Sequence, residues 1–146
     1  MTIPEINWRE RTMYHLGRRR AFSVEGDSML PTLRHGDSVL VDPRAEVAVG
    51  DIITANHPFK TSVRLIKRVA SIDPSSGRLT LCGDNPATSS DSRSFGTVAR
   101  SEIIGKVVCL IRLQNRGNIT QKRRKRTVPN TGGTHSGRKY LREFWR

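Results

Sequence analysis

The chain has 146 residues, a hydrophobic fraction of 35% and a formal net charge of +13. That length suits one small domain, and the low hydrophobic fraction indicates that part of the chain lies outside a packed core. The sequence contains no apolar run near the roughly 18–20 residues that span a bilayer, so we expect neither a transmembrane anchor nor a secretory signal.

The excess positive charge is concentrated near the C-terminus. Residues 114–146 carry ten Lys/Arg and one Glu, whereas residues 1–113 carry sixteen Lys/Arg against twelve Asp/Glu. We therefore predict a polar lead-in at 1–20, one domain at 21–113 and a disordered basic tail at 114–146. For this tail we expect at most weak contact with nucleic acid or an anionic membrane.

Short apolar or alternating runs separated by turn residues predict β-structure from Ala21 to Leu113, and therefore an all-β domain. A short helix is expected before it, from Pro4 to His15, with Ile6 and Trp8 as apolar anchors. The run Asp73-Pro74-Ser75-Ser76-Gly77 predicts the turn of a hairpin. In chain order the expected strands are AFSV, SVLVD, DIITAN, SVRLIKRVASID, RLTLC and EIIGKVVCLIRL.

The cysteines and histidines do not indicate a metal site. Cys82 and Cys109 are the two cysteines, and together with four histidines they show none of the paired spacings typical of zinc ligands. We expect both cysteines to be reduced thiols, and we expect neither a metal ion nor another cofactor.

A serine in a rigid turn is the first candidate for chemistry. Ser28 lies in VEGDSMLPTL, between Gly26-Asp27 and Met29-Leu30-Pro31. Glycine permits a positive φ and proline stiffens the chain, so the hydroxyl would be presented on a fixed loop. Ordinary turn hydrogen bonding is the better explanation on this evidence alone, because a serine nucleophile needs a base.

A lysine in an apolar strand is the candidate base. Side chains two residues apart share one face of a strand, so Lys67 is expected beside Val63, Leu65 and Val69 on a buried face. Desolvation lowers the pKa of a fully buried lysine to roughly 5–7, and a neutral amine can then act as a general base. The alternative is a lysine that reaches past the strand edge into solvent. Lys60 is the competing lysine, in a polar turn.

Short polar side chains are concentrated in the segment GDNPATSSDSRSFG. Side chains of this kind bond to the nearby backbone and hold an irregular loop rigid. Asp91 and Arg93 could form an ion pair within this loop, and Ser89 could orient the amine of Lys67. Composition alone favours a purely structural loop.

Taken together, GDSMLPTL, LIKRV and GDNPATSSDSRSFG resemble the signal peptidase I family of Ser-Lys serine proteases, over about residues 22–112. The resemblance implies a compact, partly open β-barrel with Ser28 as nucleophile and Lys67 as general base. The chain departs from the family in its small body, in its expected lack of an anchor, and in Gly26, where some members place an oxyanion-hole hydroxyl. The positions that would support the catalytic pair are Met29, Gly83, Asp84, Asn85, Ser89, Asp91 and Arg93.

The resemblance implies a serine endopeptidase whose protein substrate binds extended along an exposed strand edge. In its compact motifs the chain most resembles the subgroup of nickel-type superoxide dismutase maturation proteases, so the resemblance implies removal of an N-terminal propeptide from such a precursor in the cytoplasm. Two alternatives remain open. One is signal peptidase action by an anchorless enzyme at the membrane surface, and the other is a nucleic-acid-binding regulator that cleaves itself.

Overall fold

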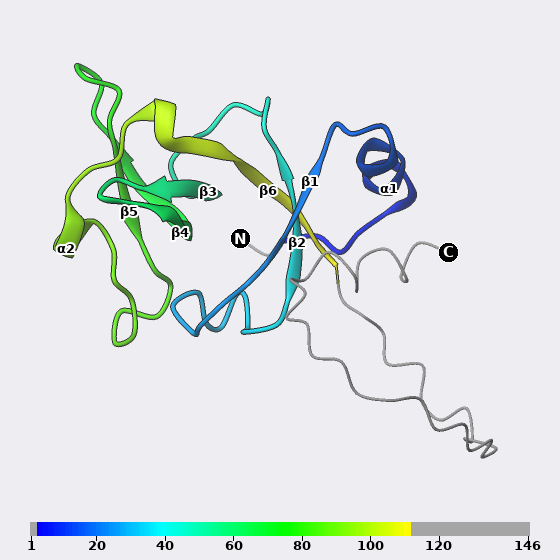
Figure 1. The fold of residues 1–146 in the computed structure, drawn as a ribbon, viewed down its shortest axis with the longest axis horizontal. Coiled ribbons are helices and arrows are strands. Elements are labelled where there is room, and N and C mark those ends of the chain that lie inside the picture. The colour runs from blue at the N-terminus through cyan, green and yellow to red at the C-terminus, as the bar shows by residue number, and fades with distance from the viewer. Residues whose placement is uncertain (1–2, 112–146) are drawn as a thin grey trace, which may run out of the picture. The chain divides into compact units, whose positions relative to one another are not determined.

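The computed structural model describes residues 3–111, and the predicted basic tail lies outside this range. Six strands form one antiparallel sheet in the order β1-β2-β6-β3-β4-β5 (Figure 1). The strands are β1 (Arg20–Ser23), β2 (Ser38–Asp42), β3 (Ile52–His57), β4 (Lys60–Ile72), β5 (Leu79–Cys82) and β6 (Ile103–Ile111).

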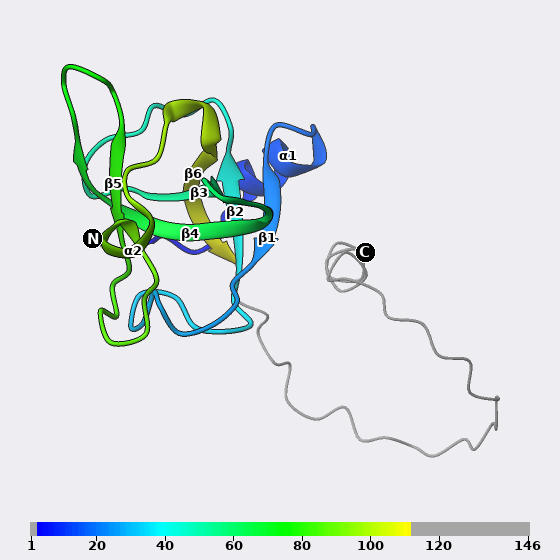
Figure 2. The same cartoon turned by 60° about the vertical axis from the view of Figure 1, so that its left-hand side comes forward.

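The sheet is strongly curved but not closed. β6 pairs with β2 through one half and with β3 through the other, so it joins β1 and β2 to the β3-β4-β5 group (Figures 1 and 2). The registers shift between Leu40 and Val41 and again between Thr54 and Ala55, and such irregularities bend a sheet. The predicted all-β, partly open architecture is confirmed.

Two apolar clusters form the core on either side of β3. Ile52 belongs to the first cluster and Ile53 to the second, because successive residues of a strand point to opposite faces. The first cluster packs the β1–β2 loop against β2 and β6, and the second fills the space between β3, β4 and β5. The fully buried members include Met29, Leu33, Val39 and Val41 of the first cluster, and Val69, Leu79, Leu81 and Val98 of the second.

The N-terminal helix α1 (Trp8–His15) is shorter than expected, and it contributes no buried residue. The chain before it pairs with β6 instead: the Ile6 N–H donates to the Leu110 carbonyl at 3.0 Å, and the Leu110 N–H donates to the Pro4 carbonyl. Asn7 then caps the helix by accepting from the Glu10 N–H. The prediction that Trp8 anchors this segment is wrong, since its side chain is 80% exposed.

Two short helices lie in segments that were not predicted to be helical, α2 (Ser92–Phe95) and the 3₁₀ helix η1 (Arg100–Glu102). The hairpin between β4 and β5 is confirmed, because the Asp73 N–H donates to the Arg78 carbonyl and Gly77 adopts a left-handed φ of 67°. None of the helices in the described part of the chain has the length and apolarity to cross a bilayer.

One buried hydroxyl in the sheet generates a prediction about stability. Thr54 in β3 is fully buried, and its Oγ1 has no hydrogen-bond partner among residues 3–111. Thr54→Val keeps the shape and removes the unsatisfied group, so we expect the free energy of unfolding to rise by about 1–2 kcal/mol. Urea denaturation measures this.

The matched control is Thr97→Val, because the exposed Thr97 hydroxyl accepts a hydrogen bond from Arg78 Nε. This control should change stability by about 0.5 kcal/mol or less, or lower it. An unchanged or lower stability of Thr54→Val would contradict the prediction.

Candidate active site

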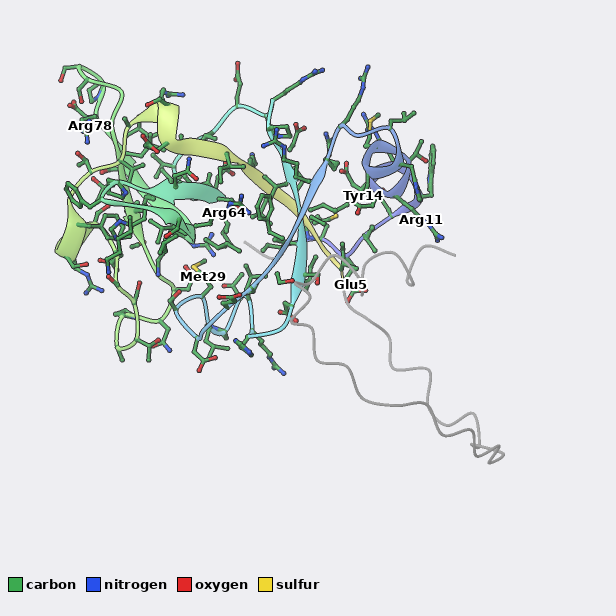
Figure 3. The ribbon with its side chains drawn as sticks, viewed as in Figure 1. Glu5, Arg11, Tyr14, Met29, Arg64 and Arg78 are labelled. Atoms are coloured by element: carbon green, nitrogen blue, oxygen red, sulfur yellow. The ribbon has the colours of Figure 1, made fainter. Side chains whose placement is uncertain are left out.

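The loop between β1 and β2 holds Ser28 in a fixed turn. Met29 is 1% exposed and points inward from this loop, and the Leu33 N–H donates to its carbonyl at 2.9 Å (Figure 3). Leu33 is itself fully buried, so two apolar side chains attach the turn to the first core cluster. Ser28 is half-buried between this anchor and the positive-φ residue Gly26.

Lys67 lies at the centre of β4 and is only 4% exposed. Leu65 and Val69 share its buried face, and Ile53 of β3 is its register partner. The alternative of a lysine that reaches solvent is therefore wrong. Val63 does not belong to this face as expected: it is 40% exposed, in the part of β4 that precedes the buried segment.

The Lys67 amine is both desolvated and oriented. Burial lowers the pKa of Lys67 below its ordinary value, and the Asp91 carboxylate and Cys82 oppose that shift only in part. Nζ donates a hydrogen bond of 2.9 Å to Ser89 Oγ. Ser89 in turn hydrogen-bonds to Asp91, where it helps to lower the pKa of that carboxyl. Burial therefore favours the neutral form of this amine, and the bond to Ser89 fixes its orientation.

Asp91 and Arg93 form the expected ion pair, but only one partner is buried. The Asp91 side chain is 1% exposed and that of Arg93 65% exposed, with 2.9 Å between Arg93 NH2 and Asp91 Oδ2. The Arg93 guanidinium, followed by the backbone amides of Arg93 and Gly83, holds the pKa of Asp91 well below its usual range despite burial. Asp91 also caps α2, which explains why the loop turns helical there.

Gly83 brings the Ser28 loop and Ser89, the partner of Lys67, to one place. A Cβ at this position would collide with Ser89 Oγ and would lie 2.5 Å from the Ser28 carbonyl oxygen, so only glycine fits. The next residues extend the contact: the Asn85 N–H donates to the Ser28 carbonyl at 2.9 Å, and its Nδ2 donates to the Asp27 carbonyl. The segment after β5 therefore links Ser28 to the neighbourhood of Lys67.

Asp84 forms a second connection between the Ser28 loop and β4, and this connection was not predicted from the sequence. Arg68 donates two hydrogen bonds to Asp84, at 2.7 and 2.6 Å, and a third to the Gly50 carbonyl. Thr32 Oγ1 donates to the same carboxylate. Burial alone would raise the pKa of Asp84, but the bonds from Arg68 and Thr32 outweigh it and the pKa is lowered. Arg68 and Thr32 both lie inside the motifs quoted above: Arg68 is the arginine of LIKRV, and Thr32 is the threonine of MLPTL.

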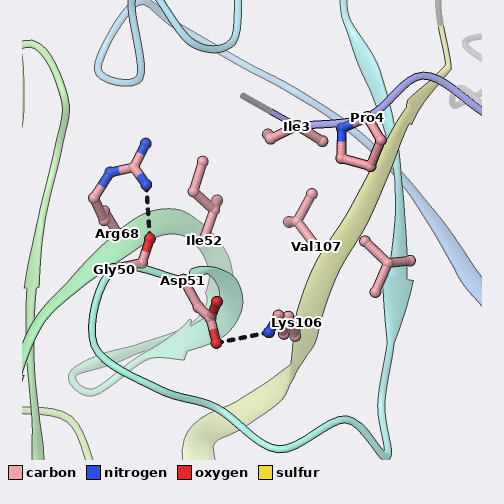
Figure 4. A pocket seen from close by; sticks show the side chains of 9 residues that line it. Ile3, Pro4, Gly50, Asp51, Ile52, Arg68, Lys106 and Val107 are labelled. Atoms are coloured by element: carbon pink, nitrogen blue, oxygen red, sulfur yellow. Dashed lines mark hydrogen bonds and ion pairs between the residues drawn. The ribbon is translucent and has the colours of Figure 1, made fainter. Parts of the chain in front are cut away.

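A pocket of about 210 Å³ lies elsewhere, lined by Arg68 but not by Lys67 or Ser28. Its charged groups are already paired: Lys106 Nζ lies 2.9 Å from Asp51 Oδ2, and Arg68 donates to the Gly50 carbonyl (Figure 4). Arg68 also bonds to Asp84. Within residues 3–111 no group of three His, Cys, Asp or Glu side chains is arranged to hold a metal ion. Cys82 and Cys109 are free thiols.

The burial of Lys67 generates a prediction about stability and pH. Because its pKa is lowered by folding, the unfolded chain binds more protons between that value and the ordinary value of about 10.4. Below this window the buried charge destabilises the fold, and this cost disappears as the pH rises through it. Lys67→Met should therefore be more stable than the wild type at neutral pH, with an advantage that shrinks toward pH 10.

Chemical denaturation of both proteins at several pH values from neutral to about pH 10 checks the expectation. Lys60→Met is the control, because Lys60 is an exposed lysine of the same strand. An advantage of Lys67→Met that is constant, or that grows with pH, would contradict the assigned direction of the pKa shift.

Comparisons with known proteins identify relatives of this chain. A model of the Peptidase S24-like family matches residues 3–108, a span that contains Ser28, Lys67 and the 83–93 segment. Mitochondrial inner membrane protease subunit 1 of Xenopus tropicalis is 36% identical over 107 residues, which cover 58% of this chain and 64% of that protein. The protein of the same name from Schizosaccharomyces pombe is 32% identical over 110 residues, with 60% and 70% covered. The chain belongs to the Peptidase S24-like family.

Proposed function

We propose that this chain is a serine endopeptidase of the signal peptidase kind, with Ser28 as nucleophile and Lys67 as general base. The observation that carries the proposal is the buried Lys67, which is 4% exposed and donates a hydrogen bond of 2.9 Å to Ser89. Ser89 and the Ser28 carbonyl both lie against Gly83, so the Ser28 loop packs beside the partner of the lysine. A buried, neutral lysine and a serine on a fixed turn are the parts of a Ser-Lys dyad. Family membership and the protease relatives support a peptidase.

The proposed reaction proceeds through an acyl-enzyme. Lys67 Nζ accepts the Ser28 Oγ proton while Oγ bonds to the scissile carbonyl carbon. The ammonium then gives that proton to the leaving nitrogen as the C–N bond breaks. In the second half, Nζ takes a proton from water, the hydroxide attacks the ester, and the proton returns to Ser28 Oγ as the acid is released.

Asp91 and Arg93 have a tuning role in this proposal. An unpaired carboxylate near the amine would favour the protonated lysine, and the Asp91 charge does act in that direction. Arg93, bonded to Asp91 through Nε and NH2, offsets that negative charge. Asp91 can then fix Ser89 without restoring the positive charge on Lys67.

The substrate is proposed to bind extended between two open strand edges. β1 is an edge strand of the sheet. Among the described residues, β4 pairs with β5 only from Arg68 onward, so the earlier part of β4 has an open edge on that side. The outer edge of β5 is not available, since Leu79 exchanges two hydrogen bonds with Val98 and the Leu81 N–H donates to Ser92. The guanidinium of Arg64 lies 5.6 Å from the ring centre of Phe22, so the open stretches of β4 and β1 lie close together. A peptide there can use backbone bonds from both edges.

The narrower proposal concerns the substrate, which we take to be a precursor with a cleavable N-terminal propeptide. The compact motifs GDSMLPTL, LIKRV and GDNPATSSDSRSFG support the nickel-type superoxide dismutase precursor as that substrate. The curated relatives carry the name of a mitochondrial inner membrane protease subunit, which supports signal peptidase-like cleavage of exported proteins at a membrane as the alternative.

The first test of the dyad is a pair of lysine variants assayed on a propeptide substrate. Lys67→Met should lower kcat/KM by about 10²–10⁴-fold, the contribution of a general base, whereas Lys60→Met should retain activity. The wild-type rate should rise with pH through the lowered pKa of Lys67 and then level off, because only the neutral amine accepts the serine proton. Full activity of folded Lys67→Met would refute the dyad.

The second test concerns the substrate. The purified chain is incubated with a nickel-type superoxide dismutase precursor and, separately, with a mitochondrial presequence-bearing precursor, and the new N-termini are determined by mass spectrometry. We expect one cut that releases the short propeptide of the first precursor, and no cut in Ser28→Ala. Cleavage of the second precursor alone would replace the narrower proposal with the alternative.

A further inference from the structure

The two arms of the loop that carries Ser28 are joined by backbone hydrogen bonds where the loop begins and ends. Closer to the serine, a side chain joins them. The Val24 N–H donates to the Asp37 carbonyl at 2.8 Å, and the Gly36 N–H donates to the Val24 carbonyl at 2.9 Å. Beyond these, the Gly26 N–H donates to Nδ1 of His35 at 3.0 Å. The imidazole thereby continues the pairing of the loop's two arms toward the serine.

Gly26, two residues before Ser28, has no packing contact that would fix its conformation. Its φ of 74° is left-handed, and nothing lies within 4 Å of the position that a Cβ would occupy. A glycine without side-chain packing has the largest conformational freedom of any residue. The peptide that enters the serine turn is therefore restrained by hydrogen bonding rather than by packing.

The carbonyl side of the same turn is already restrained from elsewhere. Asn85 donates to the carbonyls of both Asp27 and Ser28, at 3.2 and 2.9 Å. With His35 on the Gly26 amide, the backbone around Ser28 is held from both ends. Two fixed ends determine the direction of the Ser28 N–H, the group that is available as an oxyanion donor where Gly26 lacks a hydroxyl.

We propose that His35 is a positioning residue for the nucleophile, which acts through Gly26 to aim the Ser28 backbone N–H at the oxyanion of the transition state. This inference rests on the proposed role of Ser28. His35 lies in the loop's return arm, next to Gly36, and touches no reacting atom. The bond requires a ring whose proton is on Nε2, because Nδ1 must offer its lone pair.

The chemistry of the bond supplies a matched pair of variants. His35→Ala removes the acceptor. His35→Asn keeps one, because the Asn Oδ1 branches from Cγ at the place where Nδ1 branches in histidine. His35 is exposed, so neither change disturbs the core.

The kinetic expectation separates positioning from substrate binding. His35→Ala should lower kcat about 3- to 10-fold with KM unchanged, since the loss falls on the transition state. His35→Asn should restore kcat to within about twofold of the wild type. A kcat of His35→Ala equal to the wild type, or an equal loss in both variants, would overturn the inference.

A measurement that needs no substrate follows the bond itself. In ¹⁵N-labelled full-length chain, His35→Ala should shift the Gly26 amide proton resonance upfield and speed its exchange with solvent, and His35→Asn should leave both near the wild type. An unaltered Gly26 amide in His35→Ala would overturn the inference even if catalysis fell. If the wild type cleaves no peptide, the proposed function fails. A shifted Gly26 amide resonance in His35→Ala would then show only that His35 holds the loop, without a role in catalysis.

Discussion

The part-buried hydrogen bond from the buried Lys67 Nζ to Ser89 Oγ is the interaction on which the site depends. A buried ammonium is costly to the fold, and burial lowers the pKa of this amine accordingly. In the proposed mechanism this cost is what favours the neutral amine, which keeps a lone pair while one of its N–H groups is held by Ser89. On this proposal, the cost of burying Lys67 and the reactivity of its amine have one origin.

Two neighbouring residues of β4 divide the work of building the site. Lys67 faces the second core cluster and Ser89, whereas Arg68 points to the opposite face and binds Asp84. Because Asp84 also accepts from Thr32, the strand that carries Lys67 holds the loop that carries Ser28. Partly buried charge pairs of this bidentate kind are geometrically demanding, so they fix the relative position of two segments that are far apart in the sequence. Gly83 adds a steric condition to the same junction.

Several features were predictable because they depend on local sequence. Alternation in SVLVD and SVRLIKRVASID, together with turn residues such as Gly77, predicted the strands and the hairpin. The apolar residues Leu65 and Val69 on either side of Lys67 indicated a buried face, but they left open a lysine that reaches solvent, and only the structure excluded it. The exposure of Trp8 could not be read in the same way, because a short helix with an aromatic residue looks alike whether or not a surface covers it. The cap that Asp91 supplies to α2 was likewise hidden among residues that favour irregular loops.

The sequence by itself determined the β-structure, the two chemically suited side chains Ser28 and Lys67, and the rigid polar segment at 83–95, since periodicity and turn chemistry act over a few residues. Only the tertiary structure decided which groups meet. It placed Ser89 on the lysine, joined Thr32 to Arg68 through Asp84, closed the outer edge of β5 and set His35 on Gly26. These contacts join residues from separate turns and strands of the chain. Their geometry follows from sheet register and core packing, which no local pattern contains.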